Sequence, residues 1–241
     1  MTFHSPVTVV EAMSGPDWGT SIHPIGMCVP AIRVPGLSAF SDVPAGSWAE
    51  DDIRACFDES IVAGYEDDTY RPELTVTRDQ MAVYIARALA VGEDRVPAAD
   101  AWPVPTFTDV PADHWAYRYV EYAHANGVVQ GFAGGYYRPS LTLTRDQMAV
   151  YIARSIVTPT GEAGLADYTP PAVPTFADVP NTGYGSDGTE PFWAYKHIEY
   201  CVGQGVVRGY GDGLYHPELV VTRDQVAVYV SRSFKLMRVG G

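Results

Sequence analysis

The sequence of 241 residues is poor in cysteine, in positive charge and in long apolar runs. Its three cysteines, Cys28, Cys56 and Cys201, include no C-x-x-C pair and are too few for a disulfide framework. We interpret them as small buried apolar residues. No stretch reaches the ~18 apolar residues that a membrane helix needs. The first ten residues hold no Lys or Arg and do not resemble a signal peptide, so we expect either prior removal of a leader or another export route.

Positive charge is scarce: 16 Lys and Arg stand against 29 Asp and Glu, giving a formal net charge of −13. Such a surface repels nucleic acid and anionic lipid, so we expect neither as a partner, and no membrane insertion. An anionic ligand would have to be held by local basic side chains. The chain is nevertheless 46% hydrophobic, which is enough for one substantial core or several small ones.

Signals of catalysis are missing as well. The six histidines are scattered, and no G-x-S-x-G, H-E-x-x-H or glycine-rich phosphate loop occurs. The Gly-Asp loops around Asp67-Asp68, Asp187 and Asp212 lack the spacing of a calcium-binding loop, which favours simple turn chemistry. We therefore predict a non-catalytic protein with no cofactor and no metal site.

An internal repeat dominates the sequence. The segment RPELTVTRDQMAVYIARAL, Arg71 to Leu89, returns as RPSLTLTRDQMAVYIARSI from Arg138 to Ile156. A looser copy, HPELVVTRDQVAVYVSRSF, begins at His216. Self-similarity of this length marks a repeat architecture.

The register extends upstream of these segments. In each copy a tryptophan stands 30 residues before the arginine of the T-R-D-Q phrase, and a glycine follows that tryptophan by 16 residues. Each tryptophan is preceded by an F-x-D-V-P phrase, beginning at Phe40, Phe107 and Phe176. The third copy carries nine extra residues between Asn181 and Phe192, which indicates a tolerant loop.

Each copy is predicted to be a helix, a loop and a second helix. In the first helix Ala49, Ile53, Cys56 and Ser60 form a stripe at helical spacing. The second helix places Met81, Ile85 and Ala88 on one face. It begins with a T-x-x-Q capping box, in which the threonine and glutamine side chains bind each other's backbone amides. The predicted capping residues are Thr77 and Gln80, Thr144 and Gln147, and Thr222 and Gln225.

These boundaries divide the chain into an amino-terminal arm at 1–39, repeats at 40–95, 107–157 and 176–236, and Pro-rich connectors at 96–106 and 158–175. We expect the connectors to be semi-extended spacers. Two short helices cannot bury an apolar face alone, so the repeats must pack on one another. We predict a mainly α fold, a pseudo-threefold bundle of three helix-loop-helix repeats with short β or extended loops.

The ordered set of F-x-D-V-P, W-A, a glycine-aromatic turn, a proline and T-R-x-x-x-A resembles the S-layer-homology (SLH) domain, in three copies from Phe40 to Phe234. The resemblance implies a three-pronged module on the extracellular surface of the bacterial cell envelope. Such modules attach proteins to secondary cell-wall polysaccharide, often one with pyruvate ketals. The family's T-R-A-E arginine, which commonly contacts the sugar, corresponds to Arg78, Arg145 and Arg223.

The chain departs from the family at two places. Asp-Gln replaces Ala-Glu in all three copies, which puts the identity of the ligand in question. The second glycine turn, Gly131 to Gly135, lacks the aspartate of the other two, so we expect the second groove to be altered or idle.

The candidate glycan-binding residues have structural alternatives. The arginines stand next to helix-terminal amides, which favours an anion site, but they could equally form salt bridges to a neighbouring repeat. The tryptophans and the turn aromatics could stack on sugar rings or anchor a core. The full candidate set is Arg78, Arg145, Arg223, Trp48, Trp115, Trp193, Tyr65, Tyr210, Asp67 and Asp212, and Phe132 is the second repeat's turn aromatic.

Once the repeats are assigned, only the arm is left over, so we expect no cargo domain. The leading hypothesis is therefore a structural subunit that self-assembles into a surface layer, tube or filament, with the apolar pieces Val9-Val10 and Ile22 to Val34 docking on a neighbouring copy. On this hypothesis deletion of the arm abolishes assembly but preserves the fold. The alternative is a monomeric adaptor that binds wall polysaccharide through the arginines. A weaker one is a regulatory module for an envelope enzyme.

Overall fold

The computed structural model describes residues 39–183 and 189–236. This part of the chain is mainly α-helical and contains no extended strand, only isolated bridges. The helices of the first repeat are α1 (Glu50–Asp58) and α2 (Arg78–Ala90), and those of the second are α3 (Tyr117–Ala125) and α4 (Arg145–Ile156). The third repeat has α5 (Tyr195–Gly203) and α6 (Arg223–Ser233). The predicted helix-loop-helix repeats are confirmed.

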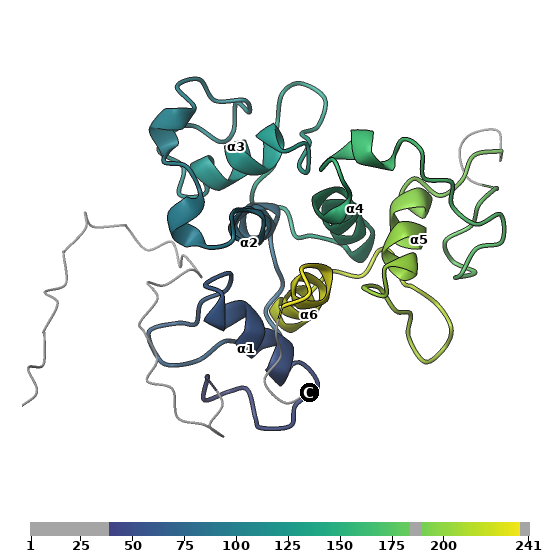
Figure 1. Cartoon of the computed structure of the whole chain (residues 1–241), viewed down its shortest axis with the longest axis horizontal. Coiled ribbons are helices and arrows are strands. Elements are labelled where there is room, and N and C mark those ends of the chain that lie inside the picture. Colours follow the sequence, from purple (N-terminus) through teal and green to yellow (C-terminus); the bar gives the residue numbers. More distant parts are fainter. Residues whose placement is uncertain (1–38, 184–188, 237–241) are drawn as a thin grey trace, which may run out of the picture.

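The second helices form the centre and the first helices the periphery. In Figure 1, α2, α4 and α6 are seen almost end-on around a common axis, with α1, α3 and α5 outside them. Each outer helix packs on the central helix of the preceding repeat: α3 on α2, α5 on α4, and α1 back on α6. The bundle is therefore pseudo-threefold, and no repeat buries its apolar faces by itself.

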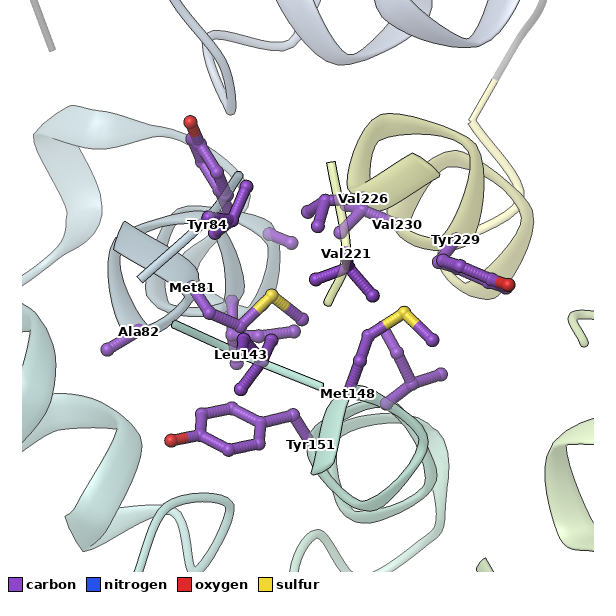
Figure 2. Packing of buried hydrophobic residues seen from close by; sticks show 14 of the residues in the cluster. Met81, Ala82, Tyr84, Leu143, Met148, Tyr151, Val221, Val226, Tyr229 and Val230 are labelled. Atoms are coloured by element: carbon purple, nitrogen blue, oxygen red, sulfur yellow. The ribbon is translucent and has the colours of Figure 1, made fainter. Parts of the chain in front are cut away.

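Hydrogen bonds around the axis join all three repeats. The amide of Val76 donates to the carbonyl of Val221 (3.0 Å), that of Val221 to Leu143 (2.9 Å), and that of Leu143 to Val76 (2.8 Å). Figure 2 shows Leu143 and Val221 at this centre with Met81 and Met148 beside them. The segments just before the three central helices thus form a closed ring of hydrogen bonds at the centre of the bundle.

Central and outer helices are buried to different extents. The predicted single apolar face of the second helix is too narrow, because nearly all of α2 is buried between its neighbours. On α1 the predicted stripe holds for Ala49, Ile53 and Cys56, whereas Ser60 lies beyond the helix end with φ +57°.

Two of the cysteines have equivalent places in the bundle. Cys56 and Cys201 are both buried in the core, as expected. Each thiol lies against the central helix of the preceding repeat, 3.4 Å from the carbonyl of Ala227 and 3.5 Å from that of Ala149, respectively. Cys28 lies outside the described residues.

The two connectors had been expected to be semi-extended spacers, but they are not extended throughout. They contain short 3₁₀ turns, η2 (Ala99–Ala101) and η3 (Glu162–Leu165), and η1 (Glu93–Arg95) comes just before the first connector. These turns bring apolar side chains onto the hydrophobic core. Leu165 is buried in that core, and Trp102, directly after η2, packs against it.

The F-x-D-V-P phrase braces the glycine-aromatic loop of its own repeat. Asp42 accepts the amides of Tyr70 and Arg71, both at 2.7 Å. Asp109 and Asp178 do the same in the other repeats. The clamped residues before the prolines have positive φ, +57° at Arg71, +58° at Arg138 and +54° at His216. A carboxylate that takes two successive amides thus holds an otherwise unfavourable backbone conformation.

Helix capping follows the prediction in two repeats of three. The Thr77–Gln80 and Thr222–Gln225 boxes are both formed. The predicted Thr144–Gln147 box is wrong, since Oε1 of Gln147 is buried without a hydrogen-bond partner. The carboxylate of Asp146 accepts the Thr144 hydroxyl and the amide of Gln147, and the aspartates of the other two repeats make the same two bonds.

Candidate functional site

A cavity of about 300 Å³ lies where the three repeats meet beside α6. We call it the α6 groove. The first repeat contributes Trp48 from the turn before α1, and the second contributes Arg145 at the start of α4. The third contributes the loop after α5 and one face of α6, namely Arg208, Gly209, Tyr210, Gln225, Val228, Tyr229 and Arg232.

The α6 groove combines cations with aromatic rings. Three of its lining residues are arginines, and no lining residue is acidic in the described part of the chain. Arg145 donates to the Tyr229 hydroxyl (2.5 Å), and its guanidinium lies 4.7 Å from the ring centre of Tyr210. Such a lining suits a ligand that has both negative charge and an apolar face.

The three T-R-D-Q arginines are buried and join neighbouring repeats. Their exposed fractions are 5% for Arg78, 3% for Arg145 and 1% for Arg223. Each guanidinium donates to two carbonyls of the following repeat, at distances from 2.8 to 3.2 Å: Tyr137 and Gln130, Tyr215 and Arg208, and Tyr70 and Ala63. These arginines connect neighbouring repeats, but the partners are carbonyls and aromatic rings rather than the carboxylates of the salt bridges that the sequence analysis considered.

The helix-terminal amides beside these arginines are already occupied. The amide of Arg78 donates to the carbonyl of Leu141 (2.9 Å), and that of Asp79 to Pro139 (3.1 Å). The amide of Gln80 binds the carboxylate of Asp79 (2.8 Å). The loop of the next repeat thus supplies acceptors for two of these amides, and the carboxylate of Asp79 accepts the third.

Two of the three candidate tryptophans, one from each repeat, lie at the surface. Trp48 is 62% exposed and Trp193 52% exposed, which excludes the core-anchor interpretation for both, whereas Trp115 is half-buried. The indole nitrogen of Trp193 donates to Asp146 (2.9 Å), and Trp115 makes the corresponding bond to Asp79. The aspartate of T-R-D-Q thus positions the tryptophan of the next repeat. Burial, the largest influence, raises the pKa of both carboxyls.

The aromatic residues of the glycine turns stack on the same arginines. The ring centre of Tyr65 lies 5.3 Å from the Arg223 guanidinium, and that of Phe132 lies 4.8 Å from Arg78. With Tyr210 on Arg145, the contact occurs in all three repeats. The turn that lacks aspartate keeps it too, so the ring-arginine contact does not depend on that carboxylate.

The candidate aspartates act within their own turns. Asp67 binds Arg71 (3.0 Å) and Thr69, and Asp212 binds His216 (2.7 Å) and the amide of Leu214 (3.0 Å). These hydrogen bonds lower the pKa of both carboxyls. Neither lines the α6 groove, and the described residues hold no group of His, Cys, Asp and Glu that could bind a metal ion. Asp187 lies outside the described residues.

Three polar residues of the groove, Arg208, Tyr229 and Arg232, were not singled out from the sequence. Arg208 has Ala63 and Gln130 at the equivalent positions, so a comparison of repeats hides it. Tyr229 and Arg232 belong to the A-V-Y-x-x-R phrase that all three copies share, and that phrase was a usable signal. Only the apolar face of that helix, with Met81, Ile85 and Ala88, had been predicted from it.

A histidine near α4 gives the fold a pH dependence. His197 on α5 is buried, with Nε2 2.9 Å from a carboxylate oxygen of Glu162, and it faces the charges of Arg154 and Lys196. Burial, as the largest influence, lowers the pKa of this histidine below its ordinary value of 6.5. The unfolded chain then binds a proton that the folded chain does not.

We therefore expect stability to fall as the pH drops below about 6.5 towards the lowered pKa of His197. Urea unfolding between pH 7 and pH 5 measures this loss, and it should be smaller in His197→Gln. The buried carboxyls of Asp79 and Asp146 act with the opposite sign at lower pH, because their raised pKa favours the folded state as they protonate. An identical pH dependence in His197→Gln would contradict the assignment.

No helix in the described part of the chain is long and apolar enough to span a membrane. The family model for the S-layer homology domain matches residues 39–82, 106–149 and 186–227, more than half of the chain.

Relatives carry the same module within larger proteins. The chain is 25% identical to cell surface glycoprotein 1 of Acetivibrio thermocellus over 81% of its own length and 8% of that protein. It is 24% identical to the cellulosome-anchoring protein of the same organism (73% and 35%) and 25% identical to an S-layer protein of Bacillus licheniformis (82% and 20%). The chain thus spans about a third or less of these relatives. With three matched repeats in a closed bundle, it belongs to the S-layer homology domain family.

Proposed function

We propose that this chain is a non-catalytic cell-surface module that attaches to the bacterial envelope by binding an anionic wall polysaccharide. The observation that carries the proposal is the α6 groove, where Arg145, Arg208 and Arg232 meet the rings of Trp48 and Tyr210. Guanidinium groups pair with carboxylates, and exposed aromatic faces suit the apolar side of a sugar ring.

The acidic surface makes this local arrangement significant. With a net charge of −13, the chain as a whole repels polyanions. A cluster of three arginines in that background confines attraction to one place. The printed names of two relatives, a cellulosome-anchoring protein and an S-layer protein, agree with a role in attachment at the cell surface.

Self-assembly is a second proposal, favoured by a different surface. Equivalent apolar side chains beside the axial contact are exposed in all three repeats: Leu74, Leu141, and Leu219 with Val220. An apolar collar around a pseudo-threefold axis suits contact with another copy. The amino-terminal arm that had been expected to mediate assembly lies outside the described residues, so the arm-deletion experiment remains a prediction.

Sedimentation with cell-wall fragments tests the attachment. Fragments that retain their secondary polysaccharide should pellet the wild-type chain, and fragments stripped of it by acid extraction should not. Trp48→Ala should weaken binding by about tenfold or more, because it removes an exposed aromatic face at the groove. Val104→Ala, at an even more exposed residue outside the groove, is the control.

The same sedimentation experiment, run with and without cell-wall fragments, distinguishes attachment from self-assembly. Pelleting that needs the polysaccharide and is lost in Trp48→Ala supports attachment. Pelleting without walls, rising with protein concentration and showing ordered polymers by electron microscopy, supports self-assembly. A chain that stays in solution in every tube would refute both.

A further inference from the structure

A second cavity, of about 160 Å³, shares Trp48 with the α6 groove. We call it the Ser47 pocket. It lies where the turn before α1 meets the first turn of α6, and its polar lining residues are Asp42, Ser47, Trp48, Glu73 and Asp224. A single water needs only about 10–15 Å³ of such space, so the pocket has room for a larger group.

A small side chain leaves this space open. The residue before the repeat tryptophan is Ser47 in the first copy, but His114 and Phe192 in the other two. The rings of His114 and Phe192 lie next to their own tryptophans, with ring centres 6.0 Å and 6.1 Å apart. A serine side chain cannot fill the volume of either ring. The pocket therefore follows from one sequence difference between the repeats.

The hydrogen bonds at this place differ as well. The indole nitrogens of Trp115 and Trp193 donate to the T-R-D-Q aspartates of the preceding repeats. The corresponding pair in the first copy is Trp48 and Asp224, which both line the Ser47 pocket but are not bonded to each other. Among the described residues the indole N–H of Trp48 has no acceptor. The pocket thus contains a donor that is left unmatched.

Asp224 adds an unmatched acceptor to the same pocket. Its Oδ1 accepts both the Thr222 hydroxyl and the amide of Gln225 (2.7 Å). Its Oδ2 accepts no hydrogen bond from the part of the chain that the structure describes, although the side chain is only 5% exposed. Buried polar atoms in proteins nearly always have a partner. A bound group that supplies a donor to Oδ2 would complete the site.

The two unmatched groups define the chemistry of that bound group. An indole N–H can only donate and a carboxylate can only accept, whereas a hydroxyl can do both at once. The pocket also contains the carboxylates of Asp42 and Glu73, and no Lys, Arg or His is among its lining residues in the described part of the chain. Such a lining repels a second acidic sugar. It suits an uncharged group that carries hydroxyls.

We propose that the Ser47 pocket is a second sugar subsite, which holds an uncharged sugar residue next to the acidic one in the α6 groove. This inference rests on the proposed attachment to wall polysaccharide. One hydroxyl of the uncharged sugar lies between the indole N–H of Trp48 and Oδ2 of Asp224. Because Trp48 lines both cavities, a single indole contacts two neighbouring residues of the polysaccharide.

Filling the pocket tests its role in attachment. Ser47→Phe gives the first copy the side chain that the third copy has, and it should weaken wall pelleting by about tenfold, because the hydrogen bonds to the sugar hydroxyl are lost. Ser140→Phe, at an exposed residue outside both cavities, is the control and should pellet like the wild type. Circular dichroism checks that both variants fold. Unchanged pelleting of a folded Ser47→Phe chain would overturn the inference.

Nuclear magnetic resonance tests the pocket without walls and without a variant. At least one of methyl glucoside, methyl mannoside and methyl galactoside should shift the Ser47 amide and Trp48 indole signals saturably, while the Trp193 indole signal stays in place. Methyl glucuronide should leave the Ser47 amide signal unchanged, because of the lining carboxylates. No saturable shift with any of the three uncharged sugars, or an equal shift with the glucuronide, would overturn the inference.

The two measurements also separate this subsite from the proposed function. A wild-type chain that pellets with walls but shows no shift loses the Ser47 subsite alone. A wild-type chain that does not pellet with walls loses the proposed attachment, and the subsite with it.

Discussion

Arg223→Met is expected to lower the free energy of unfolding by about 3–5 kcal/mol. The guanidinium is 1% exposed and donates to the carbonyls of Tyr70 and Ala63, both at 2.8 Å, and to the Tyr84 hydroxyl at 2.7 Å. Methionine fills a similar volume but donates nothing, so two buried carbonyls of the first repeat lose their donor. Each such group costs about 1–3 kcal/mol.

The loss is large compared with the ~5–15 kcal/mol by which a domain is usually stable. Urea unfolding measures it, with the exposed Arg95→Met as the matched control, which should change stability by less than about 0.5 kcal/mol. Because Arg223 closes the junction between the third repeat and the first, the variant should still unfold in one transition. A change below about 1 kcal/mol would mean that the guanidinium does not hold this junction.

Gly209→Ala is expected to destabilise the fold by about 2–3 kcal/mol. A methyl group at this position would lie 2.5 Å from Cε1 of Phe176 and 2.7 Å from the carbonyl oxygen of Leu214. Neither neighbour can give way freely, since Phe176 belongs to the core cluster and the Leu214 carbonyl accepts the amide of Tyr210 (2.8 Å).

The control lies two residues away in the same loop. A methyl group on Gly211 would meet nothing within 4 Å, and its backbone conformation does not require glycine, so Gly211→Ala should be nearly neutral. Thermal unfolding of the two variants side by side gives the comparison. Equal melting temperatures would contradict the packing of the aromatic ring against the glycine.

The repeat made most of the fold predictable from the sequence. Constant spacing from Trp48 to Arg78 in every copy fixed the two helices, and the argument that such a unit cannot bury its own face required a bundle. The sequence did not predict that each outer helix packs on the central helix of another repeat, as α1 does on α6. The apolar stripe of an outer helix would fit any of the three central helices. Its choice is made by contacts such as Arg223 with Tyr70, between residues far apart in the sequence.

The site was harder to predict for a related reason. Repeats reveal what the copies share, and Arg78, Arg145 and Arg223 are shared because they join the repeats. Arg208 of the α6 groove, in contrast, stands where the other copies have Ala63 and Gln130, so it carries no repeated signal. Trp48 was predicted as a candidate, but its exposure follows from the packing of the repeats and could not be predicted from the sequence.

The packing of α1 on α6 also determines where residues can be added to this chain without disrupting the bundle. In an open solenoid each added repeat finds a free end, so length can vary by whole repeats. Here every central helix already has an outer helix on it, and the amides of Val76, Leu143 and Val221 form a closed circuit. A fourth repeat would have no place in the ring, so insertions are confined to its loops, as with the nine extra residues between Asn181 and Phe192.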